Sequence, residues 1–387
     1  MTRTIRYICL SATLCTIASV AQIASTQTTQ NPDVAYVYVS NTLSGATNEV
    51  HAYAAAANGK LTPVIGSPFP ADVTSMAVND KYLFGSNTNG LYVDAYWIES
   101  NGALRYAASN DIVKYNSNAC SSSGPIFFDH TGATLYDMEF RSDCANNTYE
   151  SFTVEKPTGD LQNLGNSSPN DWLYLPASFI GNNVYAYSAS CLGDMYWGIY
   201  GFKRSSSGLL SEVNITAAPP TPPTGYFYCP SQAVADPTNH VAISMQPVDQ
   251  LNFSPDRAAQ LAAYTADAAG NLTTTNTSAS MPKILVGTVN DLNMAPSGKL
   301  LAVGGTAGLQ VFHFNGSQPV THYTGLLTTA GVDQMFWDKA NHLYAISRSA
   351  GKLFVFTITP TSFKQAPGSP YTMSAPQDMI VQPLPVY

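Results

Sequence analysis

A repeated unit is the feature of this sequence that most restricts how the chain can fold. Residues 61–70 (LTPVIGSPFP) and residues 363–372 (FKQAPGSPYT) share one pattern, and each segment leads into a short apolar run. A second pattern, an apolar strand followed by a polar turn and another strand, recurs in residues 127–136, 294–303 and 336–345. Self-similarity of this kind predicts a protein built from stacked repeats.

The spacing of the repeats predicts their number and type. If the first apolar strand of each repeat marks its start, successive starts are about 43 to 59 residues apart, which is typical of four-stranded propeller blades. The seven starts lie near Met76, Phe127, Phe179, Ala233, Leu292, Met335 and Met379. We therefore predict an all-β, seven-bladed β-propeller. An open solenoid or two β-sandwiches are the alternatives.

The two ends of the repeat region predict how the ring closes. Residues 35–40 read as the second strand of a blade whose first strand is absent locally, and residues 378–382 read as a first strand without a following partner. Pairing these segments would complete one blade and cover sheet edges that would otherwise be open to association. We expect the propeller to span residues 34–384 and to unfold when its last ten or so residues are removed.

The N-terminal segment reads as a processing signal. Arg3 and Arg6 precede an uncharged run over residues 7–24, and the small residues of Ser19-Val20-Ala21 suit signal peptidase. We predict a signal peptide over residues 1–21, a linker over residues 22–33 and a secreted or periplasmic mature protein. A membrane anchor is the alternative.

Composition excludes several classes of partner. Charged residues make up 11% of the chain, the formal net charge is −8, and no Lys/Arg cluster occurs, so neither nucleic acid nor an anionic membrane is an expected partner. The six histidines show no metal-ligand spacing, and phosphate loops and nucleophile elbows are absent from the sequence. We expect no metal, no cofactor, no membrane insertion of the mature chain, and a monomer.

Four cysteines of the mature chain predict two disulfides, as an even number does in an oxidising compartment. They are Cys120, Cys144, Cys191 and Cys229. Cys120 and Cys229 precede blade starts, while Cys144 and Cys191 follow second strands, so all four belong to loops at one end of the blades. Three pairings are open; we favour Cys120 with Cys144 and Cys191 with Cys229, because each joins loops close in sequence.

Four short motifs carry a resemblance to a known family. Residues 36–41 (YVYVSN), 59–61 (GKL), 66–69 (GSPF) and 297–301 (SGKLL) resemble segments of the lactonase family of seven-bladed propellers, which includes phosphogluconolactonase and the carboxymuconate lactonising enzyme. The resemblance covers residues 34–384. It implies the propeller fold and suggests lactone hydrolysis as an activity.

The residues that the family associates with activity are largely replaced. Segments 122–124, 175–177 and 188–190 stand where the family carries His, Arg and Glu side chains, and they contain none of these. The acidic residues that the family carries after the second strand of the third blade are partly kept in this chain. If the chain hydrolyses lactones, the residues expected to activate water and stabilise the oxyanion are Glu139, Arg141 and Asp143.

Two groups of residues are candidates for ligand binding. Aromatic and charged side chains gather on the cysteine-bearing face, where stacking area and charge could hold a sugar-like ligand: Asp194, Trp197, Tyr226, Tyr228 and Arg348. Aligned blade starts also give one channel-lining position per blade: Ser75, Pro125, Ala177, Gln232, Asp291, Gln334 and Asp378. The last four could hold a polyol or a hard cation, whereas ordinary hydration of a wet channel is the simpler interpretation.

The sequence leaves three functional hypotheses. The leading one is a secreted propeller that binds a small polar, sugar-like ligand or an extracellular protein through its cysteine-stapled face. The alternatives are a lactone hydrolase, suggested by the resemblance, and a structural module of the cell envelope. Fold alone does not decide among them.

Overall fold

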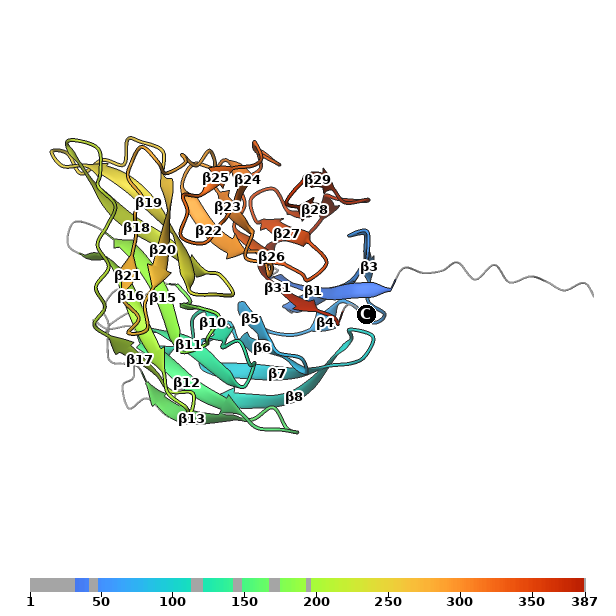
Figure 1. Ribbon diagram of the computed structural model, residues 1–387. Coiled ribbons are helices and arrows are strands. Elements are labelled where there is room, and N and C mark those ends of the chain that lie inside the picture. The colour runs from blue at the N-terminus through green and yellow to red at the C-terminus, as the bar shows by residue number, and fades with distance from the viewer. Residues whose placement is uncertain are drawn as a thin grey trace, which may run out of the picture. The chain divides into compact units, whose positions relative to one another are not determined.

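The computed structural model describes residues 32–41, 48–112, 121–141, 148–166, 175–192 and 196–385. These residues form seven antiparallel sheets arranged around a central space (Figure 1). Six sheets consist of strands that follow one another along the chain, and the seventh is completed by the last strand of the chain. Four sheets have four strands, and three have a short fifth strand beside the main path. The structure thus confirms the predicted seven-bladed, all-β propeller.

The strands of the first three blades have the following bounds. Blade 1 contains β31 (Pro376–Pro383), β1 (Asp33–Asn41), β2 (Glu49–Ala56), β3 (Leu61–Pro63) and β4 (Phe69–Pro70). Blade 2 contains β5 (Ser75–Val78), β6 (Tyr82–Ser86), β7 (Tyr92–Ile98) and β8 (Leu104–Asp111). Blade 3 contains β9 (Ser121–Ser122), β10 (Ile126–Phe128), β11 (Thr134–Arg141), β12 (Thr148–Val154) and β13 (Leu161–Asn166).

The remaining four blades follow in chain order. Blade 4 contains β14 (Ser178–Phe179), β15 (Tyr185–Leu192), β16 (Tyr196–Arg204) and β17 (Leu210–Val213). Blade 5 contains β18 (Tyr226–Ala235), β19 (His240–Asp249), β20 (Gln260–Ala266) and β21 (Leu272–Thr273). Blade 6 contains β22 (Val289–Met294), β23 (Leu300–Gly305), β24 (Gly308–His313) and β25 (Thr321–His322). Blade 7 contains β26 (Gln334–Trp337), β27 (His342–Ser347), β28 (Lys352–Thr359), β29 (Ser362–Gln365) and β30 (Tyr371–Thr372).

The ring closes through the strand pair predicted from the sequence. β31, from the C-terminal end of the chain, pairs antiparallel with β1, and Val37 lies opposite Val381 in the register. Figure 1 shows the red β31 beside the blue β1. The pair joins the two ends of the propeller in one sheet, so β1 is paired on both sides, with β2 and with β31.

The hydrophobic core lies between adjacent blades. Strands β24 and β28 are buried along most of their length, because each sheet packs on a neighbour at both faces. One cluster, for example, joins Val37 and Met379 of blade 1 to Tyr344 and Leu353 of blade 7. This packing explains why the later strands of a blade carry apolar residues on both faces.

Buried tyrosines link consecutive blades. The Tyr38 hydroxyl of blade 1 donates to the Gly102 carbonyl of blade 2 at 3.0 Å. Equivalent bonds run from Tyr82 to the Pro157 carbonyl, from Tyr136 to the Gly208 carbonyl and from Tyr187 to the Gly270 carbonyl. A buried tyrosine needs a partner for its hydroxyl. In blades 1 to 4 the outer turn of the next blade supplies it.

A buried histidine begins the second strand of blade 7. His342 is the first residue of β27 and is fully buried. The Asp338 carboxylate accepts a hydrogen bond from the His342 backbone N–H and lies 2.7 Å from Nδ1 of the ring. These contacts fix the histidine at the start of the strand, where its role is structural.

Candidate functional site

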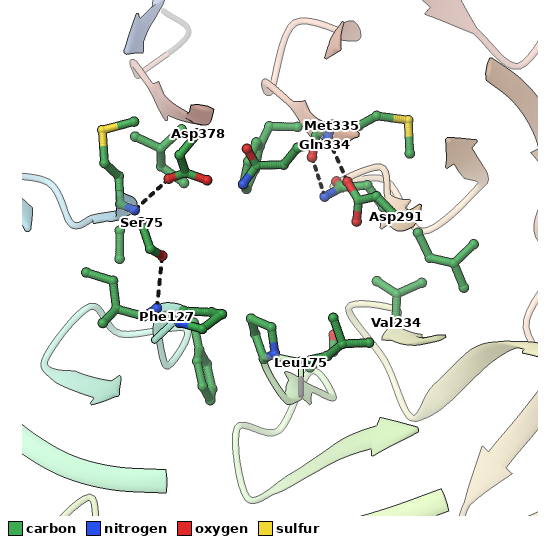
Figure 2. Close-up of a pocket in the computed structure, with 18 of the residues that line it drawn as sticks. Ser75, Phe127, Leu175, Val234, Asp291, Gln334, Met335 and Asp378 are labelled. Atoms are coloured by element: carbon green, nitrogen blue, oxygen red, sulfur yellow. Dashed lines mark hydrogen bonds between the residues drawn. The ribbon is translucent and has the colours of Figure 1, made fainter. Parts of the chain in front are cut away.

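A cavity of about 510 Å³ lies where the innermost strands of the seven blades meet. All seven positions that the aligned blade starts assigned to the channel line it: Ser75, Pro125, Ala177, Gln232, Asp291, Gln334 and Asp378. Figure 2 shows several of these side chains around the open space. We call this space the central cavity.

Polar side chains of the central cavity also connect six of the seven pairs of adjacent blades. The Asp378 carboxylate accepts a hydrogen bond from the backbone N–H of Met76 at 2.6 Å. The side-chain carbonyl oxygen of Gln334 accepts one from the backbone N–H of Met379 at 2.7 Å. Asp291 accepts from the Met335 N–H at 2.6 Å. Further links of this kind join Ser75 to Ile126, Ser178 to Ala235, and Gln232 to the Asn290 carbonyl. These polar side chains therefore have a structural role, because they join neighbouring blades. The simpler sequence-based interpretation, hydration of the channel, did not include this role.

The two aspartates that line the central cavity from blades 6 and 1 have raised pKa values. Burial raises the pKa of both Asp291 and Asp378 to about 7, because removal from water disfavours the charged form. Hydrogen bonds oppose the shift in each case. The Asp378 charge raises the pKa of Asp291 further, whereas the Arg348 guanidinium partly offsets the shift at Asp378. Both carboxyls consequently change protonation near neutral pH.

The wall of the central cavity is chemically divided. Asp378, Gln334 and Asp291 come from three consecutive blades and lie along one side, while the opposite side is formed by blades 3 and 4, which contribute Pro125, Leu175 and Ala177 (Figure 2). The polar side offers carboxyl and amide groups that bind hydroxyls, and the apolar side offers packing surface. This arrangement suits a small ligand with one polar and one apolar face.

Arg348 is an exposed residue that lines the same cavity, and its role in ligand binding stays a prediction. Its Nε donates to the Gln377 carbonyl at 2.8 Å, and its backbone N–H donates to the Asp333 carboxylate at 2.7 Å. Sequence reasoning missed Asp333, although it directly precedes the channel position Gln334. The charged side chains of the described lining are thus three aspartates and one arginine.

One of the two predicted disulfides is present in the described residues. Cys191 is bonded to Cys229, which confirms the favoured partner for this pair. Cys120 and Cys144 lie outside the described residues, so their bond stays a prediction. The placement of both cysteines in loops was wrong. Cys229 lies inside β18, because pairing with β19 continues through Tyr226 opposite Asp249. Cys191 lies inside β15, because its pairing with β16 continues to Leu192.

Five other predicted site residues lie wholly, or with their side chains, outside the described part of the chain. Asp143 and Asp194 lie outside the described residues. Glu139 and Arg141 belong to the end of β11, and Trp197 pairs with Cys191 near the start of β16, but their side chains also lie outside the described part. Their catalytic or binding roles stay predictions.

Tyr226 and Tyr228 are buried in the packing of blade 5. The Tyr226 hydroxyl donates to Asp256 at 3.2 Å, and the Tyr228 hydroxyl donates to the Gln260 side-chain carbonyl at 2.7 Å. Neither side chain lines the central cavity. Their predicted contact with a ligand remains untested.

The described residues contain neither a metal-binding cluster of His, Cys, Asp and Glu side chains nor a membrane-spanning helix. Over this part of the chain, no group of three or more His, Cys, Asp or Glu side chains is placed to hold a metal ion. No helix among the described residues is long and apolar enough to cross a membrane.

The fold and cavity define a seven-bladed β-propeller of the kind found in lactonases. The periplasmic gluconolactonase of Pseudomonas aeruginosa aligns with a TM-score of 0.64 and 14% identity, covering 91% of this chain and 100% of that one. A provisionally assigned 6-phosphogluconolactonase of Bacteroides fragilis aligns with a TM-score of 0.62 and 12% identity, covering 91% and 98%. A protein from Lactobacillus plantarum gives 0.64 and 13%, covering 90% and 99%.

By sequence, no family model and no curated protein matches the chain. At 12 to 14% identity the structural similarity establishes a shared fold. The lactonase-like propeller that the sequence motifs suggested is confirmed at that level, with wide divergence from these proteins.

Proposed function

We propose that this protein binds a small, uncharged, sugar-like ligand in its central cavity. The observation that carries the proposal is the row of hydrogen-bonding groups that Asp378, Gln334 and Asp291 form along one wall, opposite an apolar wall. Sugars have hydroxyl edges and C–H faces, which match such a divided lining. Three carboxyls against one guanidinium disfavour phosphorylated or carboxylate ligands.

We further propose that the protein acts outside the cytoplasm. The charged and apolar pattern of residues 1–21 supports a cleaved signal peptide, followed by a linker over residues 22–33 and the propeller over residues 34–384. The Cys191–Cys229 bond supports an oxidising compartment. These two features together support secretion or a periplasmic location.

A thermal-shift and calorimetric panel tests ligand binding. We expect neutral polyols and sugars, such as myo-inositol, xylitol and glucose, to include a ligand that raises the melting temperature, and gluconate to bind less well because of its charge. Asp378→Asn and Asp291→Asn should each weaken that ligand about tenfold, the value of one charge-assisted hydrogen bond. Asp80→Asn, on the exposed surface, is the matched control. Equal binding by all three variants would refute the site.

Lactone hydrolysis is the second candidate, and the near-neutral pKa values of Asp291 and Asp378 favour it. An ionised carboxylate could take a proton from water as the water adds to the lactone carbonyl, and a protonated carboxyl could give one to the ring oxygen as the C–O bond breaks. The sequence-based alternative places this chemistry on Glu139, Asp143 and Arg141.

A lactone panel separates these assignments. Turnover that Asp291→Asn and Asp378→Asn abolish would place the chemistry in the central cavity. Turnover abolished by Glu139→Ala alone would place it in the acidic segment at the end of β11. If no lactone is turned over while polyols bind, the protein is a binding module.

A further inference from the structure

Three polar side chains meet at one end of the β1–β2 ladder in blade 1. Asn41 is the last residue of β1 and lies opposite Glu49, the first residue of β2, while His51 follows two residues further along β2. Residues that lie opposite each other in an antiparallel pair point to the same side of the sheet, and so do residues i and i+2 of one strand. The three side chains therefore share one face. We call them the blade 1 triad.

The polar atoms of the blade 1 triad form a small triangle. His51 Nε2 lies 3.1 Å from Glu49 Oε1 and 3.1 Å from Asn41 Nδ2, and Asn41 Nδ2 lies 3.3 Å from Glu49 Oε1. Ligands placed about 2.1 Å from a zinc ion are about 3.4 Å apart at tetrahedral angles and about 3.0 Å apart at octahedral angles. The triangle therefore has the dimensions of three ligands on one side of a divalent transition metal.

Hydrogen bonds alone do not satisfy this triangle. Nε2 of His51 carries either a proton, which it can donate to Glu49, or a lone pair, which can accept a hydrogen from Asn41, and it cannot do both. One edge of the triangle is therefore always without a hydrogen bond. A metal ion removes this conflict, because an imidazole nitrogen, a carboxylate oxygen and an amide oxygen can all direct lone pairs toward it.

Asn41 is the buried member of the triad, with 1% of the residue exposed. Its Nδ2 makes the contacts with Glu49 and His51, whereas its buried Oδ1 has no hydrogen-bond partner among the described residues. Rotating the amide by 180° exchanges Nδ2 and Oδ1, which brings the carbonyl oxygen to the position that a cation requires. The rotation leaves one amide atom without a partner, as there is now, and it gains a bond to the metal.

Solvent reaches the other two members of the triad. The side chains of Glu49 and His51 are 28% and 25% exposed, so an ion can arrive from solution and keep water as a further ligand. Zinc sites with three protein ligands commonly hold water in the fourth position. The triad contains two side chains of the His, Cys, Asp and Glu group, and Asn41 supplies the third ligand. It therefore differs from the clusters of three such side chains that the described residues lack.

We propose that the blade 1 triad is a binding site for zinc or a similar divalent transition-metal ion. His51 supplies Nε2, Glu49 a carboxylate oxygen and Asn41 its amide oxygen. The imidazole and the single carboxylate favour zinc over calcium and magnesium, which prefer a larger set of oxygen ligands. The sequence-based expectation of no metal could not include the pairing of Asn41 with Glu49. The triad shares no residue with the central cavity, so this proposal and the ligand proposal can fail separately.

Calorimetric titration of the purified, untagged chain with zinc chloride tests the proposal. We expect one saturable zinc site, with calcium and magnesium bound at least tenfold more weakly. Glu49→Gln and His51→Gln should each weaken zinc at least tenfold, because each variant loses a strong ligand. His322→Gln removes an exposed histidine of β25 and should leave the affinity unchanged, which makes it the matched control.

Asn41→Asp distinguishes a metal site from a hydrogen-bonded network. A second carboxylate beside Glu49 repels it in the metal-free protein, so the melting temperature should fall. Zinc should restore the melting temperature and bind at least tenfold more tightly than to the wild type. Cobalt(II) gives a spectroscopic readout, since its ligand-field absorption bands should appear on binding to the wild type and be absent from His51→Gln.

Circular dichroism establishes that each variant is folded before titration. If Asn41→Asp is unfolded without metal, recovery of its folded signal on adding zinc supports the proposal, and failure to recover overturns it. The proposal is also overturned if zinc shows no saturable binding, if His51→Gln binds zinc as tightly as His322→Gln does, or if folded Asn41→Asp binds zinc no more tightly than the wild type.

Discussion

Replacing Asp378 with asparagine should stabilise the propeller at alkaline pH. Asp378 is 6% exposed, and its carboxylate accepts the Met76 N–H at 2.6 Å. Asparagine keeps a carbonyl oxygen that can accept the same bond, but it cannot ionise. The substitution therefore removes the cost of a buried charge while keeping the link between blades 1 and 2.

The magnitude follows from the pKa shift. The pKa of Asp378 rises from 3.8 in an unfolded chain to about 7 in the fold, so the folded protein holds a proton that the unfolded chain releases across this interval. The free energy of unfolding consequently falls as the pH rises from about 4 to about 7. One pKa unit corresponds to about 1.4 kcal/mol, so the full loss is about 4 kcal/mol.

Urea denaturation at pH 4.5 and pH 8 measures this effect. We expect Asp378→Asn to match the wild type within about 1 kcal/mol at pH 4.5, and to exceed it by up to about 4 kcal/mol at pH 8. Asp80→Asn, on the surface, should follow the wild type at both pH values. A difference between Asp378→Asn and wild type that does not change with pH would refute the reasoning.

Three further predictions concern the ring and its links. A chain that ends at residue 375 lacks β31, so it should lose the cooperative unfolding transition seen by circular dichroism. Cys229→Ser removes a disulfide that closes a loop with a sequence separation of 38 residues. The chain-entropy estimate gives a loss of about 4 kcal/mol in the free energy of unfolding, which urea denaturation measures. No loss would mean that the bond is absent in solution. Tyr136→Phe removes the hydroxyl bond to the Gly208 carbonyl and should cost about 1 kcal/mol in the same assay, with an unchanged value arguing against the link.

Much of the fold could be predicted because propeller repeats are visible in the chain. The recurrence of apolar strand, turn and strand marked each blade start, and the strands with missing partners at the two ends identified the pairing of β1 with β31. Alignment of the blade starts also placed Asp291, Gln334 and Asp378 in the central cavity. Equivalent positions in equivalent strands occupy equivalent places in a ring.

The chemistry of the site could not be predicted in the same way. The raised pKa values of Asp291 and Asp378 depend on burial and on backbone donors from the next blade, which no local pattern encodes. The extension of β18 back to Tyr226 was missed as well. The alternation of Phe227 and Cys229 was a visible signal for this extension, but interpreting Cys229 as a loop residue concealed it.

The most direct test of the account is the acidity of the cavity wall. Carbon-13 NMR of aspartate-labelled protein, titrated from pH 3 to pH 9, should show two carboxyl signals with midpoints near 7. One should vanish in Asp291→Asn and the other in Asp378→Asn, and a bound polyol should shift both. Titration of every aspartate signal below pH 5 would contradict the account.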